Sequence, residues 1–101
     1  MTPLVQRIID RHVKTADAHT HLIEQTLAEA YKHGGYDAMM IRAYQIEAGL
    51  GPFSHIDQPR KYLADVLRDM AAKGSIGGVP VELSNSEKSR VHMYRDDLRQ
   101  G

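Results

Sequence analysis

Apolar residues recur every three or four positions through the first third of the chain. They stand at Leu4, Val5, Ile8, Ile9, Val13, Ala16, Leu22, Ile23, Leu27, Ala30 and Tyr31. This spacing is that of one face of a helix, and Thr2-Pro3 is a typical helix start. The pattern predicts helix over residues 4–33, either as one helix or as two that divide near Thr15-Ala16-Asp17. Gly34-Gly35 should end it, because glycine favours the backbone conformation that closes a helix.

Two shorter helices are expected next, separated by a turn. The first covers residues 37–48 and begins at Asp37, a favourable N-cap residue. The turn, residues 49–56, contains two glycines and a proline. The second helix covers residues 58–73 and has apolar residues on one face and charged residues on the other. The apolar positions of the two helices are Met39, Met40, Ala43, Tyr44, Ile46, Leu63, Val66, Leu67 and Met70.

Farther along the chain, apolar positions alternate instead of following helical spacing. The alternating residues are Val79, Val81, Leu83, Val91 and Met93. Such alternation is typical of β-strands, so we expect a hairpin of strands 79–83 and 90–95 around the polar loop 84–89. Residues 96–101 should be a frayed tail. The predicted fold is therefore mainly α with a small C-terminal β-hairpin.

Composition limits the classes of protein that fit these elements. The chain of 101 residues is expected to form a single domain, residues 1–101, with 42 % apolar residues for a small core. Thirteen basic and thirteen acidic residues balance, so binding to an anionic partner would depend on the charge of one face. The chain has no cysteine, which rules out disulfides and thiolate metal sites. The N-terminal sequence does not resemble a signal peptide, and no apolar run approaches the length of a membrane span of about 20 residues. We therefore expect a cytoplasmic protein.

The apolar stripe of the first helix is longer than the rest of so small a chain can cover. Part of it should pack against another molecule, since exposed apolar surface is unfavourable in water. We expect a homodimer that pairs through residues 4–31, so that this helix or helix pair serves as a dimerisation arm.

The order of elements after the glycine-rich turn carries a resemblance to a known family. The helical run Gln58-Pro-Arg-Lys-Tyr-Leu-Ala-Asp-Val-Leu-Arg-Asp-Met-Ala-Ala-Lys73 stops at Gly74, and two short β-type runs around a polar loop follow. With the helix and turn before them, residues 37–95 resemble a winged helix-turn-helix domain. In that family the second helix enters the DNA major groove and the hairpin contacts the backbone or the minor groove. The resemblance implies sequence-specific binding of double-stranded DNA by a small transcriptional regulator of prokaryotic or phage type.

Two groups of polar side chains would then contact DNA. Arg and Gln on the exposed helix face have the geometry that reads base edges, and polar residues of the hairpin loop would contact phosphates. The predicted DNA-binding residues are Gln58, Arg60, Lys61, Arg68, Asn85, Lys88, Ser89 and Arg90. Arg60 is the expected base reader, because it lies in the first turn of its helix. Asp65 on the same face weakens the attraction to phosphate.

A protein-binding function is the alternative. A compact, neutral chain of this size could be a small binding module or inhibitor, encoded by a phage or a plasmid, that uses a winged-helix scaffold without binding DNA. Fold does not decide between the two functions. The distribution of charge on the folded surface does, because a continuous basic stripe favours DNA and acidic interruption favours a protein partner.

A pair of histidines matches a metal-binding motif by chance. Asp17-Ala-His-Thr-His-Leu22 fits the His-x-His strand of metal-dependent amidohydrolases, but those barrels need about 250 residues. Helical phasing would also point His19 and His21 to different faces. His12 and His19 lie seven residues apart and could share a metal at a dimer interface, although a surface or interface pair is the simpler interpretation. No nucleophile–base pair or phosphate-binding glycine loop stands out, so we expect no metal, no cofactor and no enzyme activity.

Overall fold

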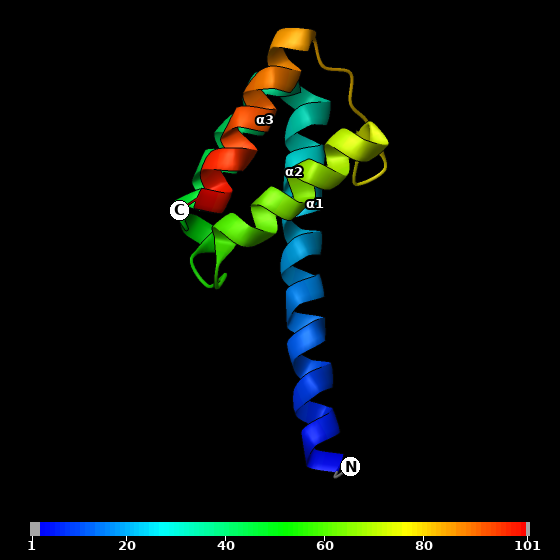
Figure 1. Ribbon diagram of the computed structural model, residues 1–101, viewed down its shortest axis with the longest axis vertical. Coiled ribbons are helices and arrows are strands. Elements are labelled where there is room, and N and C mark those ends of the chain that lie inside the picture. Colours follow the sequence, from blue (N-terminus) through cyan, green and yellow to red (C-terminus); the bar gives the residue numbers. More distant parts are fainter. Residues whose placement is uncertain (1–2, 101) are drawn as a thin grey trace.

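The computed structural model describes the backbone of residues 3–100 and the side chains of residues 17–100. The elements along the chain are α1 (Pro3–Glu47), a 3-10 turn η1 (Gly51–Phe53), α2 (Pro59–Lys73), β1 (Ser75–Ile76), β2 (Val79–Pro80) and α3 (Asn85–Gln100) (Figure 1). The protein is therefore mainly helical with a small two-stranded antiparallel sheet, as the sequence predicted at this level. Within residues 3–100, the helices are too short or too polar to cross a membrane.

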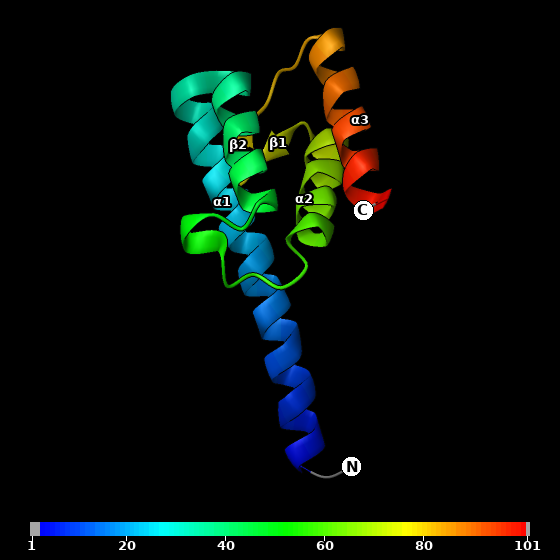
Figure 2. The ribbon, with the colours of Figure 1, turned by 90° about the vertical axis from the view of Figure 1, so that its left-hand side faces the viewer.

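Helix α1 consists of two arms that meet at a sharp reversal. Gly35 has φ 73° and ψ −157°, which is not a helical conformation. A Cβ added at Gly34 would lie 2.5 Å from the Cβ of Ala38, so the reversal needs glycine at this position too. Residues 3–34, the long arm, and residues 36–47, the short arm, therefore run antiparallel side by side (Figure 2). The predicted stop at Gly34-Gly35 is confirmed, and the long arm is one helix without a division near Thr15-Ala16-Asp17.

The long arm has two parts with different surroundings. Its first turns extend away from the other helices (Figure 1), and the molecule is 51 Å long in this direction. Its last turns lie in the core, where the side chains of Ile23 and Leu27 are fully buried. The dimer seam expected over residues 4–31 is therefore wrong for its C-terminal part, because α2 of the same chain already covers these residues. The side chains of residues 4–16 lie outside the described part.

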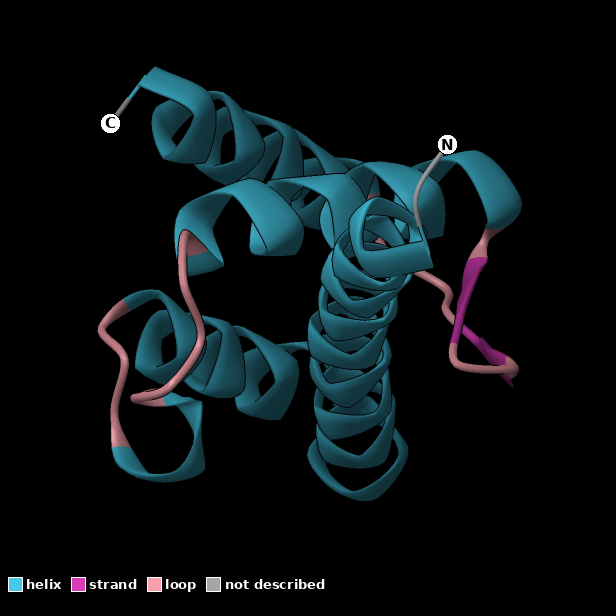
Figure 3. Ribbon diagram, turned by 90° about the horizontal axis from the view of Figure 1, so that it is seen from below, coloured by secondary structure: helices cyan, strands magenta, loops and turns pink. Residues whose placement is uncertain are grey.

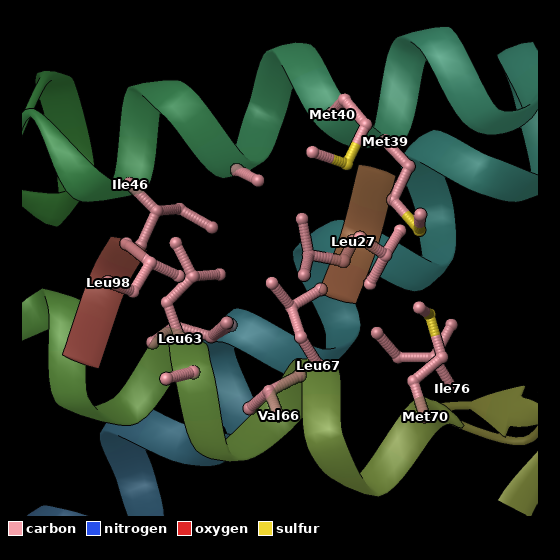
Figure 4. Packing of buried hydrophobic residues seen from close by; sticks show 14 of the residues in the cluster. Leu27, Met39, Met40, Ile46, Leu63, Val66, Leu67, Met70, Ile76 and Leu98 are labelled. Carbon is pink, nitrogen blue, oxygen red and sulfur yellow. The ribbon is translucent and has the colours of Figure 1, made fainter. Parts of the chain in front are cut away.

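The core joins the C-terminal part of the long arm, the short arm, α2 and α3 (Figure 4). Its largest fully buried side chains are Ile23, Leu27, Met39, Ile46, Leu63, Leu67, Met70 and Val66. The helical positions predicted from spacing between residues 39 and 70 thus form the core, with one exception among them, whereas Leu22, Ala30 and Tyr31 of the long arm are half-buried. Tyr44 is 54 % exposed, because it lies at the edge of the short arm beside α3.

The β-hairpin lies earlier in the chain than predicted and packs against the long arm. Ser75 pairs with Pro80 and Ile76 with Val79, and Gly77-Gly78 forms the turn with φ of 53° and 81°. A Cβ added at Gly77 would lie 3.0 Å from the Cβ of Ala28, so the tip of the hairpin sits against α1. Figure 3 shows the two strands beside the helices. A hairpin of residues 79–83 and 90–95 around a polar loop is therefore wrong.

Residues 85–100 form helix α3 in place of the expected strand and tail. The helix starts with a capping box, in which the Ser84 Oγ accepts a hydrogen bond from the Glu87 N–H at 3.1 Å. The Glu87 Oε1 in turn accepts one from the Ser84 N–H at 2.9 Å. Val91 and Leu98 are buried, and Tyr94 packs against the core. These three residues are spaced by three and four, so helical packing outweighs the short local alternation.

Candidate nucleic-acid interface

Helices α2 and α3 lie side by side and antiparallel, with α2 between α1 and α3 (Figure 2). The Arg60 guanidinium at the start of α2 reaches the Asp97 carbonyl oxygen near the end of α3. At the opposite end, Ala71 of α2 and Lys88 of α3 line a common hollow. The two helices therefore border one groove, with a hollow at each end.

The first hollow lies at the end of α2 and the start of α3, and we call it the Arg95 hollow. It is a cavity of about 310 Å³. Its lining residues are Met70, Ala71, Gly74, Val81, Leu83, Lys88, Val91, His92 and Arg95. Three basic side chains from α3 therefore stand at the edge of a largely apolar floor.

The second hollow lies at the start of α2 and the end of α3, and we call it the Lys61 hollow. It has a volume of about 480 Å³. Its lining residues are Glu47, Gln58, Pro59, Arg60, Lys61, Ala64, Asp65, Leu98 and Arg99. Lys61 from α2 and Arg99 from α3 bring positive charge to this end of the groove as well.

Basic residues follow one stripe along α3. Lys88, His92, Arg95 and Arg99 are spaced by four, three and four, which puts them on one face of the helix. The Arg95 Nη2 donates to the His92 Nδ1 at 3.2 Å, and the His92 Nε2 lies 3.5 Å from the Asp96 carboxylate. Asp96 is thus the acidic side chain that contacts this stripe.

Helix α2 adds Lys61 and Arg68 on its exposed side. We call the set Lys61, Arg68, Lys88, His92, Arg95 and Arg99 the basic groove. Helices α2 and α3 together hold eight basic and five acidic residues, whereas residues 17–47 of α1 hold two basic and five acidic residues. Within residues 17–100, positive charge is therefore concentrated on α2 and α3.

Acidic residues interrupt the α2 side of this surface. The Arg68 Nη2 lies 3.7 Å from the Asp65 carboxylate. The Lys73 Nζ donates to the Asp69 carboxylate at 2.8 Å, and this hydrogen bond raises the pKa of Lys73. Exposed ion pairs of this kind contribute little to stability. An incoming anion can therefore replace the Asp65 carboxylate as the partner of Arg68 at a small cost in free energy.

Arg60 is held inside the fold. Its Nη1 donates to the Glu47 carboxylate at 2.7 Å and its Nη2 to the Asp97 carbonyl oxygen at 2.6 Å. The Tyr94 hydroxyl donates to the other Glu47 oxygen at 2.7 Å. Burial raises the pKa of Tyr94, and the hydrogen bond to Glu47 adds to this effect. We call Glu47, Arg60, Tyr94 and the Asp97 carbonyl the Arg60 clamp, because it joins the short arm, α2 and α3.

The predicted DNA-binding residues therefore separate into groups. Lys61 and Gln58 line the Lys61 hollow and Lys88 lines the Arg95 hollow, whereas Arg68 is exposed on α2 two turns after Lys61. Asn85 and Ser89 are exposed on the first turns of α3 rather than at a hairpin tip.

Two of the predicted arginines are held by contacts within the fold, although Arg60 also lines the Lys61 hollow. Arg60 belongs to the clamp, and Arg90 lies beside Tyr36 of the short arm, where its charge opposes the rise that burial causes in the pKa of that tyrosine. Sequence reasoning missed His92, Arg95 and Arg99. Their spacing from Lys88 would have revealed the stripe if residues 85–100 had been interpreted as a helix.

The two histidines of the His-x-His sequence differ in environment, as helical phasing predicted. His19 is 9 % exposed and lies edge-on to the rings of His55 and Tyr62, at centroid distances of 5.7 and 5.6 Å. His21 is exposed. Within the described part of the chain, no three His, Asp or Glu side chains gather as metal ligands would. His12 lies outside the described side chains.

A second surface is apolar and lies on the opposite flank of α3. Ile41, Tyr44 and Met93 are 57 %, 54 % and 67 % exposed. The Tyr44 ring packs edge-on to Tyr94 with centroids 5.1 Å apart, which joins the short arm to α3. Exposed aromatic, methionine and arginine side chains are enriched in protein interfaces, and Arg90 lies on this flank too.

The basic groove has the features of a binding site for anionic groups. It combines cations from two helices, side-chain donors and a partly apolar hollow. Such an arrangement can bind phosphates or carboxylates by charge-assisted hydrogen bonds. In comparisons with known proteins, no family model, no curated protein and no solved structure matches this chain.

Proposed function

We propose that the protein binds double-stranded DNA through the basic groove. The observation that carries this proposal is the stripe of Lys88, His92, Arg95 and Arg99 along α3, beside Lys61 and Arg68 of α2. Lys88 and Arg99 are eleven positions apart in the helix, which corresponds to about 16 Å along its axis. This is the axial length of about five phosphates in one DNA strand. The cations Lys88, Arg95 and Arg99 of this stripe therefore match a stretch of the phosphate backbone of that length.

Sequence-specific regulation of transcription is the finer form of this proposal. The order of short arm, turn, α2 and hairpin over residues 36–80 supports a winged helix-turn-helix, with α3 in place of the second long strand. Gln58, Lys61 and Arg68 would supply base contacts from the exposed side of α2. Because the hairpin tip is packed on α1, the phosphate contacts would come from α3. A cytoplasmic location belongs to the same proposal.

A homodimer is compatible with this mode of binding. Ile23 and Leu27 lie in the core of one chain, so a second copy would pair through the part of the long arm that extends away from the body. Two copies would present two grooves, as dimeric regulators do for two half-sites. Light scattering at tens of micromolar tests this directly. A single chain of about 11 kDa would contradict the dimer without contradicting DNA binding.

The apolar surface of Ile41, Tyr44 and Met93 supports protein binding as the second candidate. A monomeric soluble protein rarely exposes several large apolar side chains together unless they meet a partner. Replacing Tyr44 and Met93 by serine would then abolish partner binding. The same replacements should leave DNA binding unchanged, because these residues lie across α3 from the basic groove.

The proposal is tested by selecting from random DNA duplexes at near-physiological salt and titrating the enriched sequence by fluorescence anisotropy. We expect enrichment, and we expect R95Q and R99Q each to weaken binding about tenfold or more, since a charge-assisted contact contributes about 1.5–3 kcal/mol. K32Q is the matched control, because Lys32 is an exposed cation on the long arm. Binding weaker than the non-specific range of about 10⁻⁴ to 10⁻⁶ M, or equal losses in K32Q, would contradict DNA binding by the groove.

A further inference from the structure

The Arg95 hollow has the size of a small-molecule site. Its volume of about 310 Å³ is at the lower end of the range for ligand pockets, about 300–1,000 Å³. Its walls come from the end of α2, residues 81–83 and the first three turns of α3. A ligand of modest size would therefore touch three separate segments of the chain.

The wall formed by residues 81–83 is held in place without a ligand. The Val81 N–H donates to the Gly74 carbonyl oxygen at 2.9 Å. The Tyr31 hydroxyl accepts a hydrogen bond from the Glu82 N–H at 3.1 Å and donates to the Glu82 carbonyl oxygen at 3.2 Å. These bonds attach an irregular segment to α1 and α2. The hollow is thus preformed, which lowers the entropic cost of binding.

The lining of the hollow divides into an apolar floor and a basic edge. The side chains of Met70, Ala71, Val81, Leu83 and Val91 form the floor, and those of Lys88, His92 and Arg95 form the edge. All three edge residues come from one face of α3. The hollow therefore suits a molecule that is apolar at one end and anionic at the other.

Arg95 brings a guanidinium group to this edge. Its Nη2 donates to the His92 Nδ1, but its Nε is shielded from solvent and has no partner. Because Nε is shielded, a carboxylate in the hollow would bind the Arg95 guanidinium through its Nη groups, by the charge-assisted hydrogen bonds that guanidinium and carboxylate form. Lys88 lies two turns before Arg95 on the same face of α3 and also lines the hollow, so its ammonium group can add a second contact to the carboxylate.

We propose that the Arg95 hollow binds a small carboxylate with an apolar body. The carboxylate lies against Arg95 and Lys88, and the apolar body covers Met70, Leu83 and Val91. The inference does not rest on DNA binding. The two functions share Lys88 and Arg95, however, so a bound carboxylate occupies cations that a phosphate would use. Such a ligand lowers the affinity of the groove for DNA.

Octanoate is a suitable probe, because it joins a carboxylate to a short hydrocarbon chain. Titration followed by ¹⁵N NMR should give saturable shifts confined to the residues around the hollow. Acetate and 1-octanol, which each keep one half of the probe, should bind at least tenfold more weakly. Equal binding of octanol would overturn the role of the basic edge, and equal binding of acetate would overturn that of the apolar floor.

Two variants test the site itself, with circular dichroism to verify folding. R95Q should weaken octanoate binding about tenfold, and R95K should restore part of it. A71L should abolish binding by filling the hollow, because Ala71 is an exposed lining residue whose enlargement leaves the core in place. K32Q on the long arm should have no effect. Unchanged octanoate binding in A71L would contradict the inference.

The effect on DNA separates the two proposals. Octanoate should raise the apparent Kd for DNA in the unaltered protein and leave it unchanged in A71L. If octanoate binds while no duplex does, the inference stands and the proposed function fails. If DNA binds while octanoate does not, the inference fails alone.

Discussion

Replacing Arg60 by methionine tests whether this residue holds the fold together. R60M keeps an apolar stem of similar length and removes the guanidinium that bonds the Glu47 carboxylate at 2.7 Å and the Asp97 carbonyl oxygen at 2.6 Å. The variant leaves Glu47 bonded to Tyr94 alone. It also removes the charged link between α2 and the last turns of α3.

The magnitude follows from the number of bonds and their exposure. Hydrogen bonds to charged groups contribute about 1.5–3 kcal/mol each when desolvated. The side chains of Arg60 and Glu47 are 37 % and 26 % exposed, so solvent screening reduces this sum substantially. We expect R60M to lower the free energy of unfolding by about 2 kcal/mol. In a domain of this size, that corresponds to a fall of about 10 °C in Tm.

Urea unfolding followed by circular dichroism at 222 nm measures this change. K61M is the control, since Lys61 is the next residue on the same helix, is exposed and should change stability by no more than about 0.5 kcal/mol. A double-mutant cycle with E47Q should show coupling between the two positions. If R60M is as stable as K61M and instead loses DNA affinity, Arg60 is a base reader and the clamp has no structural role.

Three further changes have defined outcomes. S84A should cost about 0.5–2 kcal/mol by removing the capping box of α3, and hydrogen exchange should show the loss first in the amides of that helix; unchanged protection would contradict it. Burial and the bond to a carboxylate raise the pKa of Tyr94, so the unfolded chain releases this proton first as pH increases, and stability should fall above about pH 10. The free energy of unfolding of Y94F should fall less steeply with pH in this range, and its slope should differ from that of the unaltered protein by at most about 1.4 kcal/mol per pH unit. G77A should destabilise more than G78A in thermal unfolding, because both residues have positive φ but only Gly77 closely approaches the long arm; equal losses would mean that the hairpin tip is free.

The helices with long apolar patterns were predictable from sequence. The long arm, the short arm and α2 each place four or more apolar residues at helical spacing. Such residues share one face of their helix, so helix formation lets all of them be buried in one core. The end of the long arm at Gly34-Gly35 was predictable, because the reversal needs glycine at both positions. Gly35 has a positive φ, and Gly34 lies too close to Ala38 to carry a Cβ. The extent to which the long arm packs within its own chain was not predictable, because it depends on where α2 lies.

The error at residues 90–95 came from the length of the pattern considered. Over six residues, Val91 and Met93 fit alternation. Over sixteen residues, Val91, Tyr94 and Leu98 fit a helix. Ser84 followed by Glu87 is a readable capping box, and it would have decided between these interpretations. Met93 is 67 % exposed, so it does not share a buried face with Val91.

The candidate site was predictable only in part. Lys61 and Arg68 were identified as exposed cations of α2, and Lys88 was identified within a wrongly assigned loop. The hydrogen bonds of Arg60 join positions 13 and 37 residues away in the chain. Such tertiary contacts have no local sequence signal. The omission of His92, Arg95 and Arg99 followed from the strand assignment, since their common face exists only in a helix.

The salt dependence of DNA affinity tests the basic groove most directly. The logarithm of the association constant for a random duplex should fall linearly with the logarithm of salt concentration, with a slope of about −0.9 for each phosphate neutralised. Lys88, Arg95 and Arg99 of α3 then predict a slope of about −2.7 if each of them meets one phosphate. Neutralising any one of Lys88, Arg95 or Arg99 should reduce its magnitude by about 0.9, and K32Q should leave it unchanged. A slope near zero would contradict DNA binding through the basic groove. So would a reduction of the slope by K32Q as large as the reduction by R95Q.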